Sequence, residues 1–167
     1  MTNNDILRRI RYTFDFSDSK MIAIWASAGM EVERSEVSDW LKSDDDLDFQ
    51  KCNDLSFATF LNGLINDQRG KQEGPQPVAE KRLNNNIIIR KLKIALNLQA
   101  DELLELINQA DLRLSKHELS AFFRKPGHKH YRSCHDQVLR NFLNGIQQKY
   151  RAQSGASLYQ NYPTPSL

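Results

Sequence analysis

Apolar residues along this chain recur every three or four positions, which is the spacing of the buried face of an α-helix. The clearest faces are Ile6, Ile10 and Phe14 near the start, and Ile88, Leu92 and Leu96 in the middle. No stretch alternates apolar and polar residues convincingly, as a half-buried strand would. The pattern therefore predicts an all-α protein.

The same pattern returns after 82 residues without a gap. The letters FLNG stand at residues 60–63 and again at 142–145, and Cys52 and Cys134 are separated by the same interval. Apolar character matches at further pairs, among them Leu7 and Ile89, Ile24 and Leu106, Val37 and Leu119, and Leu64 and Ile146. A gapless match of this length is hard to obtain by chance. It predicts two homologous units that arose by duplication.

Each unit is predicted to hold four helices, because residues suited to helix N-termini precede four apolar faces. In the first unit the expected starts are the Asn3–Asn4 pair, Ser17, Glu33 with Glu36, and a residue near Asp54. The second unit has the pair Asn85 and Asn86, a capping box at Ser115 and Glu118, and a start near Asp136. Gly63 and Gly145 fall inside the fourth helices or near their ends. A unit of about 65 residues buries only a small core, so we expect the two four-helix units to pack on each other.

The expected boundaries are residues 1–69 for an acidic first unit, 70–84 for a linker, 85–150 for a basic second unit and 151–167 for a flexible tail. Residues 70–84 contain two glycines and two prolines, which favour a loop. The tail is placed by its Gly, Ser and Pro residues.

Several stretches together resemble one family of bacterial proteins. They are NNDILRRIRYTF, EVSDWLK and FLNGLI in the first unit, and NNIIIRKLKIAL and HKHYRSCHDQVLRNFLNG in the second. In these motifs the chain is similar to the YehS-like family, over roughly residues 3–147. The resemblance implies a tandem duplicated, all-helical, cytoplasmic protein without an established activity. It supplies no site residues.

Charge divides the chain into an acidic and a basic part, although the overall net charge is only +2. Residues 1–70 carry 8 Lys/Arg and 13 Asp/Glu, a net −5, and residues 71–167 carry 15 Lys/Arg and 8 Asp/Glu, a net +7. The longest apolar stretches, such as residues 21–26, are too short to cross a bilayer, and arginines interrupt the first turns. We therefore expect a cytoplasmic protein with no membrane contact.

A basic run in the second unit is the strongest candidate site. It reads RKPGHKHYR, with His128, His130 and Tyr131 interleaved, and a basic helix follows it. Such a run can pair with the phosphates of a nucleic acid and release counterions. The candidate contact residues are Arg124, Lys125, Lys129, Arg132 and Arg140. The alternatives are a solvated basic face, or a surface that docks against the acidic first unit.

Residues 17–42 resemble a helix-turn-helix, with a capped helix, a turn at Gly29 and a second helix SEVSDWLK. The turn is about five residues long rather than three or four, and bulky Trp25 stands near the expected crossing. The second helix is also acidic, which repels phosphate. These details favour ordinary helix packing over a motif that reads a DNA groove.

The remaining polar clusters do not form a recognisable catalytic or metal site. His128, His130, Cys134 and His135 have zinc-binding side chains, but their spacing matches no closed structural site. The acidic run at residues 44–48 lacks the spacing of a calcium loop and is expected to be a solvated connection. Cys52 and Cys134 precede helices and could be reactive thiols or, more commonly, buried ones.

We therefore expect a non-enzymatic binding protein without cofactor or metal, which contacts nucleic acid through its second unit. The competing hypothesis is a protein adaptor or self-associating module that uses an apolar groove between the units. The oligomeric state is left open by the sequence.

Overall fold

The structure is a computed structural model that describes residues 1–108 and 112–151, and these residues form helices and no strand, as predicted. The helices of the first unit are α1 (Asn3–Phe14), α2 (Asp18–Ser27), α3 (Arg34–Leu41) and α4 (Asp54–Arg69). Those of the second unit are α5 (Asn85–Ala95), α6 (Ala100–Ile107), α7 (Lys116–Ala121) and α8 (Asp136–Ile146), followed by the π-helical turn η1 (Gln147–Arg151). Of the predicted flexible tail, residues 151–167, all but Arg151 lie outside the described residues.

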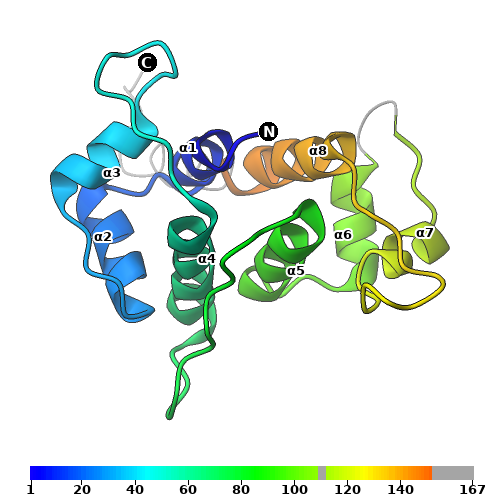
Figure 1. Cartoon of the computed structure of the whole chain (residues 1–167). Coiled ribbons are helices and arrows are strands. Elements are labelled where there is room, and N and C mark those ends of the chain that lie inside the picture. Colours follow the sequence, from blue (N-terminus) through cyan, green and yellow to red (C-terminus); the bar gives the residue numbers. More distant parts are fainter. Residues whose placement is uncertain (109–111, 152–167) are drawn as a thin grey trace, which may run out of the picture.

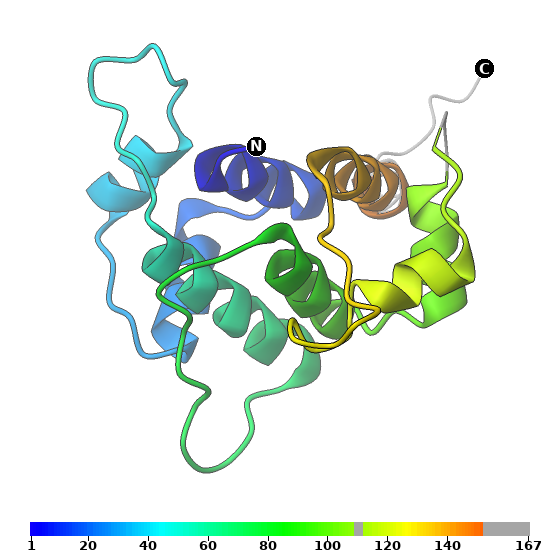
Figure 2. The ribbon, with the colours of Figure 1, turned by 45° about the vertical axis from the view of Figure 1, so that its right-hand side comes forward.

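Four central helices join the two units (Figures 1 and 2). α4 packs against α5, and α1 packs against both α8 and η1. A shift of 82 residues converts α1 into α5, and it converts α4 into the combined span of α8 and η1, residues 136–151. The two contacts are therefore one contact made twice with the units exchanged, as an approximate two-fold axis requires. The predicted packing of the units on each other is observed.

One apolar core runs through both units. In the part of the core that belongs to the first unit, Trp25 of α2 packs against two other aromatic rings. Its ring centroid lies 5.1 Å from that of Trp40 and 4.8 Å from that of Phe60. Its indole Nε1 donates to the Ser56 carbonyl oxygen at 2.9 Å, so the buried polar atom of this large side chain is satisfied. In the described part of the chain, no helix has both the length and the apolar character that a bilayer span needs.

The predicted caps of the second and third helices are confirmed where the structure describes them. The Ser17 hydroxyl accepts a hydrogen bond from the backbone of α2 at 3.1 Å. Ser115 and Glu118 form the expected capping box at the start of α7, and Glu33 and Glu36 form its counterpart at α3. These local signals were sufficient because a cap depends on residues within a single turn.

The asparagine pair that begins each unit does not cap a helix, contrary to the prediction. Thr2 caps α1, so Asn3 and Asn4 lie within the first turn. Asn4 is fully buried and crosses to the segment before α4. Its Nδ2 donates to the carbonyl oxygens of Trp40 and Gln50, both at 2.9 Å, and its Oδ1 accepts from the backbone NH of Cys52 at 3.0 Å.

The second unit repeats this arrangement around Asn86. Its Nδ2 donates to the carbonyl oxygens of Phe122 at 3.1 Å and Arg132 at 2.8 Å, and its Oδ1 accepts from the NH of Cys134 at 2.9 Å. In both units one buried amide thus satisfies three backbone groups of the loop before the fourth helix. The asparagine therefore determines the path of that loop.

The FLNG motif has three structural roles. The first two are in the core and in the contact between the units. Its Phe and Leu residues are buried in both copies. Asn62 Oδ1 accepts a hydrogen bond from Lys91 Nζ at 2.5 Å, and Asn144 Oδ1 accepts one from the Arg9 guanidinium. Lys91 and Arg9 are 82 residues apart and each lies on the first helix of the opposite unit. The asparagine of the motif therefore connects the two units.

The glycine of the motif allows two helices to approach closely. A Cβ atom placed on Gly63 would overlap the carbonyl oxygen of Ile24 in α2, and one on Gly145 would overlap that of Leu106 in α6. Ile24 and Leu106 are themselves a matched pair, so the same crossing occurs in both units. FLNG is duplicated because core, unit contact and helix crossing all depend on it.

Replacing Gly63 or Gly145 by alanine tests this crossing. Alanine normally favours a helix by about 1 kcal/mol over glycine. Here the overlap with a backbone oxygen should reverse the sign and lower the free energy of unfolding by about 2 kcal/mol or more, measured by urea denaturation. Gly127→Ala is the matched control, because no atom lies within 4 Å of its Cβ position. Equal stability of the Gly63→Ala and Gly127→Ala proteins would contradict the close crossing.

Both cysteines are buried at the starts of α4 and α8. Burial raises the pKa of the Cys52 thiol to about 12, and the nearby Asp54 carboxylate adds to the shift. Cys134 has a pKa raised to about 12 for the same reasons, with Asp136 as the neighbouring charge. Of the two alternatives that the sequence left open, the structure therefore favours buried, unreactive thiols.

The thiols should resist modification in the folded protein. A rise in pKa from 9.0 to about 12 lowers the thiolate fraction near pH 8 by about 1,000-fold, apart from the steric protection. We expect a disulfide reagent such as DTNB to react only as the chain unfolds. Since the unfolded thiols ionise first, their contribution to stability is constant at neutral pH and decreases as the pH rises from about 9 towards 12. Ser133→Cys places an exposed thiol beside Cys134 and should react at once; equally fast reaction of the wild type would contradict the burial.

Candidate nucleic-acid interface

Four of the five predicted contact residues lie on one loop, which we call the basic loop and define as residues 122–135 between α7 and α8. Lys125, Lys129 and Arg132 are exposed, and Arg124 is half-buried. Among residues 1–108 and 112–151, no carboxylate lies within 4.0 Å of any of these four cations. The loop thus presents four positive charges that the described protein does not neutralise.

Short backbone turns determine the shape of the basic loop. The NH of His128 donates to the Lys125 carbonyl oxygen and the NH of Tyr131 to that of His128, both at 2.9 Å. The imidazole Nδ1 of His128 accepts from the NH of His130 at 3.0 Å. Where the loop ends, the NH of Arg132 donates to the Ala121 carbonyl oxygen at 3.2 Å. These bonds, together with those of Asn86, hold the loop against the second unit.

The matching loop of the first unit, residues 40–53, has the same turns and the opposite charge. Asp46 NH donates to the Ser43 carbonyl oxygen at 3.0 Å, and the NH of Phe49 donates to the Asp46 carbonyl oxygen at 3.2 Å. The Asp46 carboxylate accepts from the NH of Asp48 at 2.9 Å, at the place where His128 serves in the second unit. A carboxylate and an imidazole are thus interchangeable acceptors, so this backbone shape does not require either charge.

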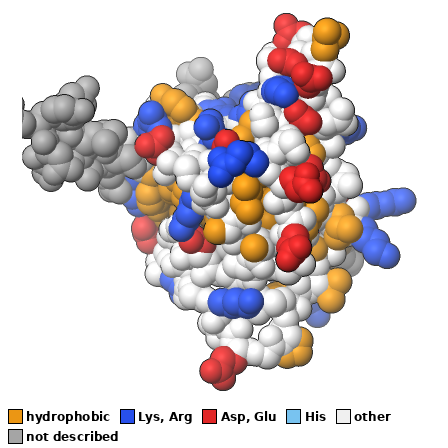
Figure 3. Space-filling view, turned by 90° about the vertical axis from the view of Figure 1, so that its left-hand side faces the viewer, with side chains coloured by type: hydrophobic (Ala, Val, Ile, Leu, Met, Phe, Trp, Pro, Cys, Tyr) orange, Lys and Arg blue, Asp and Glu red, His pale blue; other side chains and the backbone are white. Residues whose placement is uncertain are grey.

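This acidic loop, as we call residues 40–53, projects from the first unit (Figure 3). Arg8 and Lys42 neutralise part of it, through ion pairs to Asp44 at 3.2 Å and Asp48 at 3.9 Å. The acidic and basic loops lie away from each other in Figures 1 and 2. The alternative in which the basic run docks on the acidic unit of the same chain is therefore not what the structure describes.

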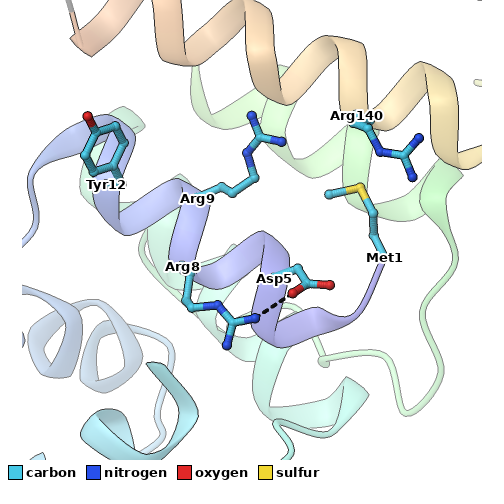
Figure 4. Close-up of a pocket in the computed structure, with 6 residues that line it drawn as sticks. All are labelled: Met1, Asp5, Arg8, Arg9, Tyr12 and Arg140. Carbon is cyan, nitrogen blue, oxygen red and sulfur yellow. Dashed lines mark hydrogen bonds and ion pairs between the residues drawn. The ribbon is translucent and has the colours of Figure 1, made fainter. Parts of the chain in front are cut away.

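Arg140, the fifth predicted residue, belongs to a different place. It lies on α8 and lines a cavity of about 560 Å³ between α8 and α1, together with Met1, Asp5, Arg8, Arg9 and Tyr12 (Figure 4). Most of these side chains are charged, so this groove between the units is not the apolar one that the adaptor hypothesis expected. No motif in the sequence marks Arg9 as a functional residue. The available signal was its match with Lys91 across the repeat.

The geometry of α2 and α3 does not favour a helix-turn-helix. Residues 28–33 separate the two helices, which is longer than the three or four residues of that motif. Val37 and Trp40 bury one face of α3. Its N-terminal turn carries the capping box of Glu33 and Glu36, so carboxylates occupy the end that contacts bases in this class of protein.

The described residues contain no group of three or more His, Cys, Asp or Glu side chains that could hold a metal ion. The rings of His128 and His130 are 5.5 Å apart and exposed, whereas Cys134, near the end of the same loop, is buried. The four zinc-type side chains of the basic loop are thus not brought together.

Comparison with known proteins identifies the family but no activity. The chain is 38% identical over 156 residues to the uncharacterized protein YehS of Escherichia coli (strain K12). This alignment covers 93% of the present chain and 100% of YehS. No solved structure matches the chain. Residues 3–70 and 85–152 each match a family described as a protein of unknown function (DUF1456), in agreement with the two units of the fold. The chain therefore belongs to the DUF1456 family.

Proposed function

We propose that this protein is a cytoplasmic, non-enzymatic binding protein that contacts the phosphate backbone of nucleic acid through its basic loop. The observation that carries the proposal is the group of four cations, Arg124, Lys125, Lys129 and Arg132, that have no carboxylate partner among the described residues. Lys and Arg at such positions bind phosphates and release condensed counterions. Three of these cations stand where the first unit has uncharged residues, so the fold does not require a cation at those places, whereas Arg124 matches another cation, Lys42.

Comparison of the two loops supports this proposal. The acidic loop shows that the same turns form without three of the four cations, because Ser43, Leu47 and Gln50 stand at the places of Lys125, Lys129 and Arg132. Repulsion among four cations on one loop lowers the stability of the folded protein. A role in binding is a physical reason for these cations to be present together. The exposed imidazoles of His128 and His130 stand among the cations and can stack on unpaired bases. No base-specific contact is proposed, because a short loop offers few groups that could read base edges.

A salt series tests the role of the loop. With a labelled 20-base-pair DNA duplex or a single-stranded RNA, four phosphate contacts predict that log K falls with log salt at a slope of about −3 to −4 on duplex DNA. The triple variant Arg124→Gln, Lys125→Gln and Lys129→Gln should bring this slope close to −1. The matched control carries the same loss of charge at the exposed linker residues, as Lys71→Gln, Lys81→Gln and Arg82→Gln.

The control should retain the wild-type slope. If both triple variants weaken binding equally, overall charge explains the affinity and the basic loop is not the contact surface. Undiminished binding by the loop variant would reject the proposal.

A second candidate function is self-association, in which the basic loop of one copy meets the acidic loop of another. The observation in its favour is that two loops of the same shape carry opposite charges and lie away from each other on the molecule. Such a head-to-tail contact is heterologous and would form open chains or rings rather than a closed dimer. Opposite charges of this kind accelerate and orient association, and salt weakens the contact.

Sedimentation velocity distinguishes the two functions. Self-association predicts a sedimentation coefficient that rises with protein concentration at about 20 mM salt and returns to the monomer value at about 500 mM. Asp45→Asn with Asp48→Asn should abolish this rise and leave nucleic-acid binding intact, because both side chains belong to the acidic loop alone. A single monomeric species across all concentrations at low salt would exclude this function.

A further inference from the structure

The two equivalent contacts between the units differ in how their cations are neutralised. On the side where α4 meets α5, Lys91 donates to Asn62 at 2.5 Å and forms an ion pair with Glu80 of the linker, Nζ to Oε1, at 2.9 Å. On the side where α1 meets α8, Arg9 takes the place of Lys91 and donates to Asn144 and, at 3.4 Å, to Gln147. No carboxylate of the described residues lies within 4.0 Å of Arg9.

A further cation on the second side increases this difference. Arg140 projects towards the cavity from α8, whereas the matching residue on the other side is the buried Ala58 of α4. The Arg140 guanidinium donates to the side-chain oxygen of Gln137 at 3.1 Å, which is a neutral partner. The guanidinium groups of Arg9 and Arg140 therefore line the same cavity, and both donate hydrogen bonds only to side-chain amides.

The carboxylates near the cavity already have partners. Asp5 accepts from the Arg8 guanidinium at 2.5 Å and from the NH of Thr2 at 3.0 Å. Asp136 accepts from Asn85 at 2.7 Å and from the Met1 ammonium at 3.0 Å, and these two partners, with a smaller contribution from the charge of Arg140, lower the pKa of its carboxyl. Burial lowers the pKa of Arg9, and the charge of Arg140 adds to this, so the two positive charges oppose each other. An anion placed between them would remove that opposition.

We propose that the cavity between α1 and α8 binds a small oxyanion, the phosphate or carboxylate group of a small molecule, through Arg9 and Arg140. Guanidinium groups bind both kinds of oxyanion through paired hydrogen bonds. The cavity, of about 560 Å³, is open to solvent on one side, so a small oxyanion can reach both guanidinium groups. The ring of Tyr12 lines it as well, with the Arg151 guanidinium carbon 4.0 Å from the ring centroid. The ligand takes the role that Glu80 has on the opposite side, and it thereby links the two units.

The repeat itself supplies the test variants. Arg140→Ala introduces the residue found at the matching position 58, and Arg9→Lys introduces the residue found at the matching position 91. Because the other unit folds with these residues, both variants should fold. The probes are inorganic phosphate, pyrophosphate and citrate, with sodium chloride at equal ionic strength as the control, measured on the full chain by calorimetry and by thermal unfolding. A ligand that binds only the folded protein raises the unfolding temperature, and this rise grows with the logarithm of the ligand concentration above the dissociation constant.

We expect saturable binding of at least one probe, and Arg140→Ala should weaken it by about 10- to 100-fold, as the loss of a charge-assisted hydrogen bond implies. Binding of the phosphates alone identifies a phosphorylated ligand, and binding of citrate alone identifies a carboxylate. The triple variant of the basic loop should bind the probes like the wild type, which separates this site from the proposed nucleic-acid interface. Binding that Arg140→Ala leaves unchanged, or a wild type that responds to the probes only as it does to chloride, would overturn the proposal.

Discussion

The contact between the two units is the interaction on which the rest of the molecule depends. Each unit of about 65 residues is too small to bury a large core, and the structure solves this by making one contact twice around an approximate two-fold axis. In each half of the contact, the FLNG asparagine accepts from a cation on the first helix of the other unit. The neighbouring glycine brings the outer helices close enough to close the core. One four-letter motif thus couples the fold within a unit to the pairing between units.

The loop between the third and fourth helices is determined independently of its surface charge. Asn4 and Asn86 satisfy three backbone groups each, and these buried bonds are nearly equal in length in the two units. Unpaired backbone groups in a buried position cost more than any surface ion pair contributes, so the asparagine determines the loop's path and its exposed side chains do not. The exposed residues could therefore differ between the copies without a change of backbone, with Ser43, Leu47 and Gln50 in one loop at the places of Lys125, Lys129 and Arg132 in the other.

The fold could be predicted from the sequence because its evidence is local or periodic. The 82-residue repeat, the helical spacing of apolar residues and the caps at Ser17 and Ser115 each depend on residues near one another in the chain or on self-similarity. The sequence alone predicts the wrong role for the Asn3–Asn4 pair, because asparagine suits both a helix cap and a buried amide. Only the tertiary path of residues 40–53 distinguishes the two roles.

The candidate sites were harder to predict because they depend on contacts between distant residues. Arg140 follows the basic run closely in sequence, yet α8 turns it towards α1 and away from the loop. Arg9 carries no motif of its own, and its importance appears only when Lys91 and Glu80 are compared with it across the approximate two-fold axis. Where the two copies keep the same residue, as at Asn4 and Asn86 or at the two FLNG motifs, the structure assigns that residue a task in folding. Where they differ without a change of backbone, as at Ala58 and Arg140, the fold does not require the residue. Arg140 adds a second guanidinium to the cavity beside Arg9, and a bound oxyanion would offset the repulsion between the two charges.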